Sequence, residues 1–253
     1  MKKILTILAG FFCAFALSAT DPSLLVHLKF DEGKGDVIKD HSGKGHDAKL
    51  INGKWVQESV SGSAVELNGK DACISIPWSK DLDLSEEFTY SIWFKMYKNK
   101  YGMNLFARGN YTLGFQFYIF DSFVNFHSLK VKGKSLIYTY FKYADIVKDL
   151  PFYQITVTST KGSKPGERIL RYYVNGVQRE NAKHMGGGKD RVLTGPLPVN
   201  RKCDTTIGRF SSHEGQWFKG IVDEAKIYSR PLSAKEIEEE YKKLSTSAAN
   251  IKK

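Results

Sequence analysis

Residues 29–47, KFDEGKGDVIKDHSGKGHD, place two Gly-Lys-Gly triplets and four aspartates in one short segment. A largely apolar run, LLVHLKF (24–30), overlaps its start, and HDAKLIN (46–52) overlaps its end. This composition suits three different structures: a phosphate-binding loop, a calcium-binding loop, or a turn that joins two β-strands. The spacing of the glycines and the acids decides among them.

A phosphate-binding loop requires Gly-x-x-x-x-Gly-Lys-Ser/Thr between a strand and a helix. With Lys44 as the lysine, Ile38 stands where the first glycine belongs. An EF-hand requires oxygen ligands at its first, third and fifth positions. Beginning at Asp31, the third position is Gly33, and beginning at Asp40, the fifth is Lys44. Both loops are excluded, and the segment predicts a turn between strands.

Short runs rich in Val, Ile, Tyr and Phe fill most of the remaining chain, separated by Gly, Asn, Asp and Pro. Their alternation of apolar and polar residues is typical of strands with one buried face. The predicted strands are residues 24–30, 46–52, 63–68, 72–77, 88–96, 104–109, 112–120, 123–130, 135–142, 153–160, 168–176, 205–210 and 220–229. Many short strands at nearly regular spacing predict an all-β fold, a two-sheet antiparallel sandwich.

Two local patterns add detail to this fold. Asn175-Gly176 between β-rich runs predicts a hairpin, because this dipeptide favours the tight turns that match strand twist. The stretch PLSAKEIEEEYKKL (231–244) predicts one short C-terminal helix, with Ser233 as its N-cap and Glu236 as the capping-box partner. Leu232 and Ile237 occupy the hydrophobic-staple positions of this helix.

The domain organisation follows from the two ends of the chain. Residues 1–19 combine a basic start, an apolar run and small residues, which predicts a signal peptide and a secreted or periplasmic protein. Residues 20–244 are predicted to form a single domain, with 181–204 as a long loop, and 245–253 a disordered tail. No later segment is apolar for long enough to predict a transmembrane helix.

The formal net charge of +11 raises the possibility of a nucleic-acid partner. The lysines are scattered along the chain rather than clustered, so nucleic acid is not predicted as a partner. An acidic polysaccharide suits an exported basic protein better. The only cysteines beyond the signal peptide are Cys73 and Cys203, and export into an oxidising compartment predicts a disulfide between them, with two buried thiols as the alternative.

The ordered motifs at both ends of the chain resemble a known family. FDEGKG…DHSGKG near the start, FTYSIWFK in the middle and TTIGRF…GIVDEAKIYSRPLSAKEI near the end are similar to laminin-G-like, concanavalin A-like lectin and glucanase domains. The resemblance covers nearly the whole chain after the signal peptide and implies a jelly-roll sandwich. This family includes binding modules, enzyme appendages and glycosidases, so the resemblance specifies the fold more closely than the function.

A calcium site is the first chemical prediction that the resemblance supports. In jelly rolls the first and last strands usually pair, which would bring Asp31 near Asp223, and related glucanases hold a structural calcium at the position of Asp223. Two carboxylates with backbone carbonyls would supply the oxygen ligands that calcium prefers. The alternative is that both acids cap turns. Pentraxin-style calcium is disfavoured, since GRFSSHEGQW (208–217) holds a single acid.

Catalytic motifs do not occur in recognisable form. The Glu-x-Asp-x-(x)-Glu triplet of retaining glucanases of this fold is absent, and so is a Gly-x-Ser-x-Gly nucleophile elbow. His41 and His46 lack the further ligands that a zinc site needs. Sugar binding requires an aromatic platform with planar polar groups. The resemblance implies that two loops share one rim, which makes the candidate ligand cluster Arg108, Asn110, Arg209 and Trp217.

The sequence therefore predicts a secreted, non-catalytic binding or interaction module whose partner is a glycan or acidic polysaccharide. The alternatives are a glycan-active enzyme of the same fold and a structural envelope protein. The oligomeric state is not determined by these patterns.

Overall fold

The structure, a computed structural model, describes residues 21–97, 103–110, 113–120, 123–131, 134–142, 152–180, 190–194, 202–210 and 216–250. The predicted signal peptide lies outside these residues. No helix in the part of the chain described here is long and apolar enough to cross a membrane.

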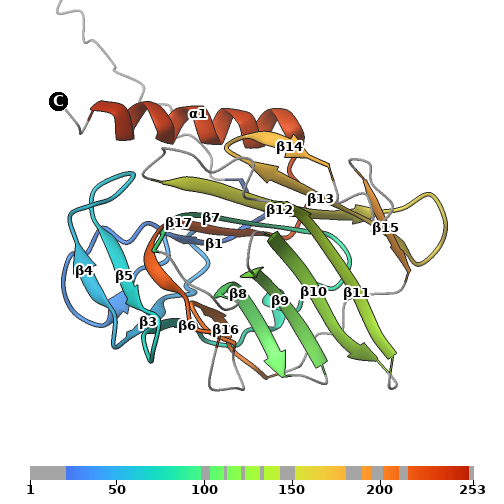
Figure 1. Cartoon of the computed structure of the whole chain (residues 1–253), viewed down its shortest axis with the longest axis horizontal. Helices are drawn as coiled ribbons and strands as arrows, with labels where there is room; N and C mark the ends of the chain where they lie inside the picture. The colour runs from blue at the N-terminus through green and yellow to red at the C-terminus, as the bar shows by residue number, and fades with distance from the viewer. Residues whose placement is uncertain are drawn as a thin grey trace, which may run out of the picture.

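Within the described residues the strands form two antiparallel sheets, of nine and eight strands, which confirms the predicted sandwich (Figure 1). The first has the order β14-β13-β12-β7-β17-β5-β4, with β1 beside β17 and β15 beside β13; the second has the order β11-β10-β9-β8-β16-β6-β3-β2. The nine-stranded sheet comprises β1 Leu24–Leu28, β4 Lys54–Val56, β5 Ala64–Asn68, β7 Phe88–Met96, β12 Tyr153–Lys161, β13 Glu167–Val174, β14 Val177–Arg179, β15 Arg191–Thr194 and β17 Lys219–Tyr228. The eight-stranded sheet comprises β2 Val37–Ile38, β3 Ala48–Ile51, β6 Cys73–Ile76, β8 Met103–Asn110, β9 Leu113–Phe120, β10 Phe123–Val131, β11 Lys134–Lys142 and β16 Thr205–Ile207.

The core lies between the two sheets and is rich in aromatic residues. Tyr90 of β7 packs against Phe106 of β8 and Phe115 of β9, with ring centroids 5.2 and 5.1 Å apart. Alternate residues of each strand enter this core, as the period of two predicts. The sheet faces that point away from the core therefore carry the remaining side chains, and these faces hold both the C-terminal helix and the candidate site.

The two ends of the chain meet in the nine-stranded sheet, because β1 pairs with β17, with Leu28 opposite Ala225. This confirms the predicted pairing of the first and last strands. The ladder between β17 and β7 shifts register between Asp223 and Lys226. Glu224 lies in this bulge with φ of +47°, a left-handed conformation that is rare for residues other than glycine.

Helix α1 (Ala234–Asn250) lies across the outer side of the sheet that contains β12, β13 and β14 (Figure 1). The capping box is confirmed: the Ser233 N–H donates to Glu236 Oε2 at 2.7 Å, and the Glu236 N–H donates to Ser233 Oγ at 3.2 Å. Tyr241 stacks on Trp93 with ring centroids 5.3 Å apart. The rings hold the helix on the sheet.

The helix ends at Asn250 rather than at the predicted residue 244. The side-chain hydroxyl of Thr246 donates to the Lys242 carbonyl, one turn back, at 2.5 Å. Ala248 and Ala249 follow and have high helix propensity. The prediction of a disordered tail is therefore wrong for residues 245–250, and residues 251–253 lie outside the described part.

The predicted hairpin at Asn175-Gly176 is confirmed. These two residues join β13 to β14 with φ of +52° and +77°, as a turn with two left-handed residues requires. The predicted loop 181–204 is wrong in one part, because Arg191–Thr194 forms β15 and pairs with β13. The four-residue strand was too short to stand out within a Gly- and Pro-rich stretch.

Cys73 and Cys203 are not joined by a disulfide, so that prediction is corrected. β6 and β16 are antiparallel, with Thr205 opposite Ile76. Cys203 precedes Thr205 by two residues and Cys73 precedes Ile76 by three, so the cysteines lie at opposite ends of this strand pair, about 16 Å apart at ~3.3 Å per residue. A disulfide requires Cα atoms within about 7 Å.

The opening segment 29–47 forms a turn held together by Asp40. The Asp40 carboxylate accepts backbone N–H groups from His27, Ser42 and His46, each at 2.9 Å. Burial raises the pKa of the Asp40 carboxyl, but these N–H donors and the Ser42 hydroxyl outweigh it, so the pKa lies below its ordinary value. The segment is a structural clasp that ties the turn to β1.

Candidate ligand-binding face

The outer face of the eight-stranded sheet carries a row of polar side chains. Asn104 of β8 is opposite Tyr118 of β9, which is opposite Asn125 of β10. Gln116 lies on the same face of β9, because Phe115 and Phe117 on either side of it enter the core. Asn104, Gln116 and Asn125 are buried and Tyr118 is partly exposed. These four residues are called the polar face.

Residues 216–218, just before β17 begins, bind the backbone of Asn104 and of Gly208, the residue after β16. Asn104 donates from its backbone N–H to the Gln216 carbonyl at 3.2 Å and from Nδ2 to Gln216 Oε1 at 3.3 Å. Gln116 Nε2 lies 3.4 Å from the same Gln216 Oε1. Gln216 has φ of +56°, an uncommon conformation that these contacts hold in place. The amides therefore fix the position of the next residue, Trp217.

Trp217, the residue after Gln216, forms a partly exposed pair with Arg209. The Arg209 guanidinium lies 5.9 Å from the Trp217 ring centroid, a cation–π contact, and both side chains are partly exposed. Arg209 is anchored through its backbone carbonyl, which accepts the Thr206 hydroxyl at 2.8 Å. Its Nε is buried and has no hydrogen-bond partner among the described residues. The pair offers a partly exposed aromatic ring beside a guanidinium.

The structure brings together only two of the four residues predicted to bind ligand. Arg108 is almost fully buried, and its guanidinium binds the Leu82 carbonyl and the Asp83 carboxylate. Its position on β8 points it into the sandwich, since Ala107 faces outward toward Phe210. Arg108 is therefore part of the interior and not of the surface rim. Asn110 ends β8, and its side chain lies outside the described residues.

Asp31 and Asp223 hold the same segment, residues 60–63, from two sides. Asp223 is fully buried and accepts N–H groups from Val60 at 2.7 Å and Ser61 at 3.2 Å. Asp31 Oδ1 accepts the Ser63 N–H at 3.2 Å, and any side chain at Gly62 would collide with this carboxylate. Burial raises the pKa of Asp223 well above its usual value, while the N–H donors act in the opposite direction.

These contacts fit a pair of loop caps better than a calcium site. N–H donors point at the carboxylates that calcium would need as ligands. In the part of the chain that the structure describes, no group of three or more His, Cys, Asp or Glu could hold a metal ion. The predicted calcium ion stays a prediction, and an experiment that separates the two roles is given in the Discussion.

A cleft of about 570 Å³ lies between α1 and strands β1 and β17. Its charged side chains bind one another: His27 Nε2 lies 2.7 Å from Glu224 Oε2, and Lys226 Nζ lies 3.0 Å from Glu240 Oε1. Tyr228 also donates its hydroxyl to Glu240 at 2.5 Å. The first pair joins β1 to β17, and the contacts of Glu240 join β17 to the helix.

Sequence reasoning missed Asn104, Gln116 and Gln216, the residues that support the Arg209–Trp217 pair. One signal was present: Gln116 interrupts the aromatic run GFQFYIF (114–120) at an outward position of the strand. That alternation marks a polar residue on the outer face. It cannot show that Gln216, a hundred residues later, would lie against it.

Comparison with known proteins places this fold. Residues 68–238 match the sequence profile Laminin_G_3, described as the concanavalin A-like lectin/glucanases superfamily. No curated protein matches the chain.

Several solved structures share its architecture at low sequence identity. The receptor-binding domain of botulinum neurotoxin type G is 17% identical with a TM-score of 0.62, over 87% of this chain and 51% of that one. The binding domain of botulinum neurotoxin DC in complex with SialylT is 17% identical with a TM-score of 0.62, over 88% and 52%. This chain thus spans about half of the neurotoxin domains. Domain 4 of AbnA, an extracellular GH43 arabinanase of Geobacillus stearothermophilus, in complex with arabinotriose, is 16% identical with a TM-score of 0.55, over 86% and 97%. At such identity these similarities concern the fold.

Proposed function

The chain belongs to the concanavalin A-like lectin/glucanases superfamily, and from this premise we propose that it is an exported, non-catalytic carbohydrate-binding module. The main observation behind the proposal is the contact between Arg209 and Trp217. Trp217 is positioned by its neighbour Gln216, which is hydrogen-bonded to Asn104 of the polar face. A partly exposed indole offers a flat apolar surface to a sugar ring, and the guanidinium beside it offers hydrogen bonds to the hydroxyls of the sugar.

Two further points support this proposal. The residue before the aromatic ring, Gln216, is held by the buried amides of Asn104 and Gln116. Preorganised contact residues lose less entropy when a ligand binds. The AbnA domain with arabinotriose is a further, weaker support, since it is a similarly folded domain solved with an oligosaccharide. Export through residues 1–19 remains a part of the proposal.

The experiment is a glycan array probed with the protein lacking residues 1–19, with and without chelator. We expect binding to one or more glycans that persists when calcium is removed. An array without any bound glycan would overturn the proposal and favour a structural role. Turnover of the bound glycan would favour an enzyme of this fold.

The Trp217→Ala variant tests the site itself. We expect the Kd for the glycan found on the array to rise roughly thirtyfold, because removing a central aromatic anchor costs about 2 kcal/mol. Arg209→Ala should raise it about fivefold, a typical effect of ~1 kcal/mol for an exposed cation–π partner. Isothermal titration calorimetry measures both.

Trp78→Ala is the matched control. Trp78 is an exposed tryptophan that follows β6, and its backbone N–H donates to Asp204, at the end of β16 opposite to Arg209. Its loss should leave the Kd within a factor of two, as expected for a residue outside the contact area. Equal loss of binding in Trp78→Ala and Trp217→Ala would place the ligand elsewhere.

A further inference from the structure

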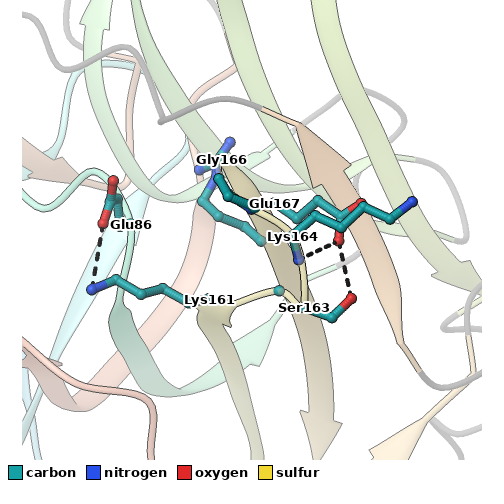
Figure 2. Close-up of a pocket in the computed structure, with 9 residues that line it drawn as sticks. Glu86, Lys161, Ser163, Lys164, Gly166 and Glu167 are labelled. Atoms are coloured by element: carbon teal, nitrogen blue, oxygen red, sulfur yellow. Dashed lines mark hydrogen bonds and ion pairs between the residues drawn. The ribbon is translucent and has the colours of Figure 1, made fainter.

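A pocket of about 340 Å³ lies at the turn between β12 and β13, far in sequence from the Arg209–Trp217 pair. Its rim is formed by residues 161–167 and by Glu86, which faces Lys161 across the opening (Figure 2). Arg168, the next residue, also lines it. This turn has no role in the glycan-binding proposal.

Arg168 is a buried cation with no ion-pair partner among the residues that the structure describes. Its side chain is 2% exposed, with Nη1 donating to the Ser85 carbonyl at 3.2 Å and Nε lacking any hydrogen-bond partner among the described residues. Burial lowers the pKa of Arg168 to about 10, and the charge of Glu86 opposes this only in part. Removing a guanidinium from water without a counter-charge costs several kcal/mol, as a rough estimate for one ion.

The nearby carboxylates are already bound to other groups. Glu86 Oε2 pairs with Lys161 Nζ at 3.8 Å. Glu167 folds back onto its own turn, where Oε2 accepts the Lys164 N–H at 3.1 Å and the Ser163 hydroxyl at 3.4 Å (Figure 2). The pocket thus contains three cationic side chains and two carboxylates, and neither carboxylate forms an ion pair with Arg168.

We propose that this pocket binds an oxyanion group, a sulfate, phosphate or carboxylate, with Arg168 as its central ligand and Lys161 and Lys164 at its rim. An oxyanion would supply both the counter-charge and the acceptor that the Arg168 Nε lacks, and planar guanidinium groups bind such anions in a forked geometry. The oxyanion group belongs either to a free anion or to an acidic polysaccharide, and both would bind the Arg168 guanidinium in the same way.

The test compares sodium sulfate with sodium chloride at equal ionic strength. For the wild-type protein we expect a saturable rise in Tm of about 4 °C at ten times Kd, as linkage predicts for a site present only in the folded state. Sulfate also stabilises proteins generally, without saturation. Specific binding is therefore measured by the part of the rise in Tm that saturates with sulfate concentration. Isothermal titration calorimetry with sulfate and with inorganic phosphate confirms it.

Arg168→Met removes the charge but keeps much of the side-chain volume. We expect this variant to lose the saturable rise and to melt in chloride at the wild-type temperature or above it, because a buried unpaired charge is gone. Arg171→Met is the matched control: Arg171 is on the outer side of the same strand, paired with Asp190 at 2.6 Å, and its variant should keep the full sulfate response.

Lys161→Gln combined with Lys164→Gln provides a second variant, since both side chains are exposed. We expect at least a fivefold weaker sulfate affinity in it. Wild-type and Arg168→Met proteins with equal sulfate responses, or no saturable response in the wild type, would overturn the proposal. If sulfate binds at this site, titration with polygalacturonate distinguishes the two sources of the oxyanion. Binding of polygalacturonate that requires Arg168 identifies a polysaccharide as the ligand. If polygalacturonate does not bind through Arg168, the ligand is a free anion.

Discussion

Replacing Asp40 with alanine lowers the free energy of unfolding by about 4 kcal/mol, because each buried N–H group left without an acceptor costs about 1–3 kcal/mol. Three backbone N–H groups, from His27, Ser42 and His46, lose their shared acceptor in this variant. The turn would then lose its attachment to β1. Thermal melting should show a fall in Tm of about 10 °C, at roughly 2–4 °C per kcal/mol for a chain of this size.

Asp36→Ala is the control for this prediction. Asp36 lies in the same turn and carries the same charge, but its side chain is exposed. Its replacement should change stability by less than about 0.5 kcal/mol, as is usual for surface sites. Equal effects of the two substitutions would show that charge, and not the hydrogen bonds of Asp40, stabilises the segment.

The same hydrogen bonds give stability a defined pH dependence. The folded state holds the pKa of Asp40 below its ordinary value, so the unfolded chain binds this proton first as the pH falls. The contribution of Asp40 is therefore complete above about pH 4, near the unfolded pKa, and is lost as the pH falls through the lower folded pKa. Between pH 5 and pH 2, wild-type stability should fall more steeply than that of Asp40→Ala in urea titrations.

Replacing Asp223 with alanine is the second large effect, with a loss of about 3 kcal/mol expected from unsatisfied N–H groups and a small cavity. The N–H groups of Val60 and Ser61 lose their acceptor at a fully buried position, and the Glu224 N–H loses Asp223 Oδ1 at 2.8 Å. Thermal melting in the presence of chelator measures this loss. Asp31→Ala should cost about 1 kcal/mol or less, since an exposed carboxylate with one N–H contact contributes little.

Calcium provides the second arm of the experiment. If Asp31 and Asp223 act as loop caps, the wild-type Tm is the same with calcium and with chelator, and both variants keep their differences. If both carboxylates hold calcium, the wild-type Tm rises with calcium and the rise is absent from Asp31→Ala as well as Asp223→Ala. The second outcome would contradict the capping role.

Local signals in the sequence predicted several elements correctly. Asn175-Gly176 marked its hairpin, because the preference of these two residues for left-handed backbone angles does not depend on distant contacts. Ser233 and Glu236 marked the start of α1 for the same reason, since they bind each other's backbone within one turn. The predicted end of this helix was wrong, because no comparably strong stop signal follows residue 244.

The candidate site was predicted only in part. Arg209 and Trp217 were identified by residue type, and the structure places them in contact. Arg108 was chosen on the same grounds and is buried beside Asp83, because its direction depends on which face of β8 enters the core after the register shift in the β8–β9 ladder. Such a shift depends on how β8 pairs with β9, and no residue pattern within β8 indicates it.

The sequence by itself determined that the protein is a two-sheet sandwich with one C-terminal helix, because the period of two, the turn residues and the capping box act over a few neighbouring residues. Only the tertiary structure decided the role of single polar side chains. In the folded protein Asp40 binds the turn 29–47 to β1, and Gln216 accepts a hydrogen bond from Asn104. Cys73 and Cys203 lie at opposite ends of the β6–β16 pair and form no disulfide. The tertiary structure also left the Arg168 Nε without a hydrogen-bond partner among the described residues. The physical reason is that a polar side chain acts through the groups that surround it, and in a sandwich these come from strands far apart in the chain.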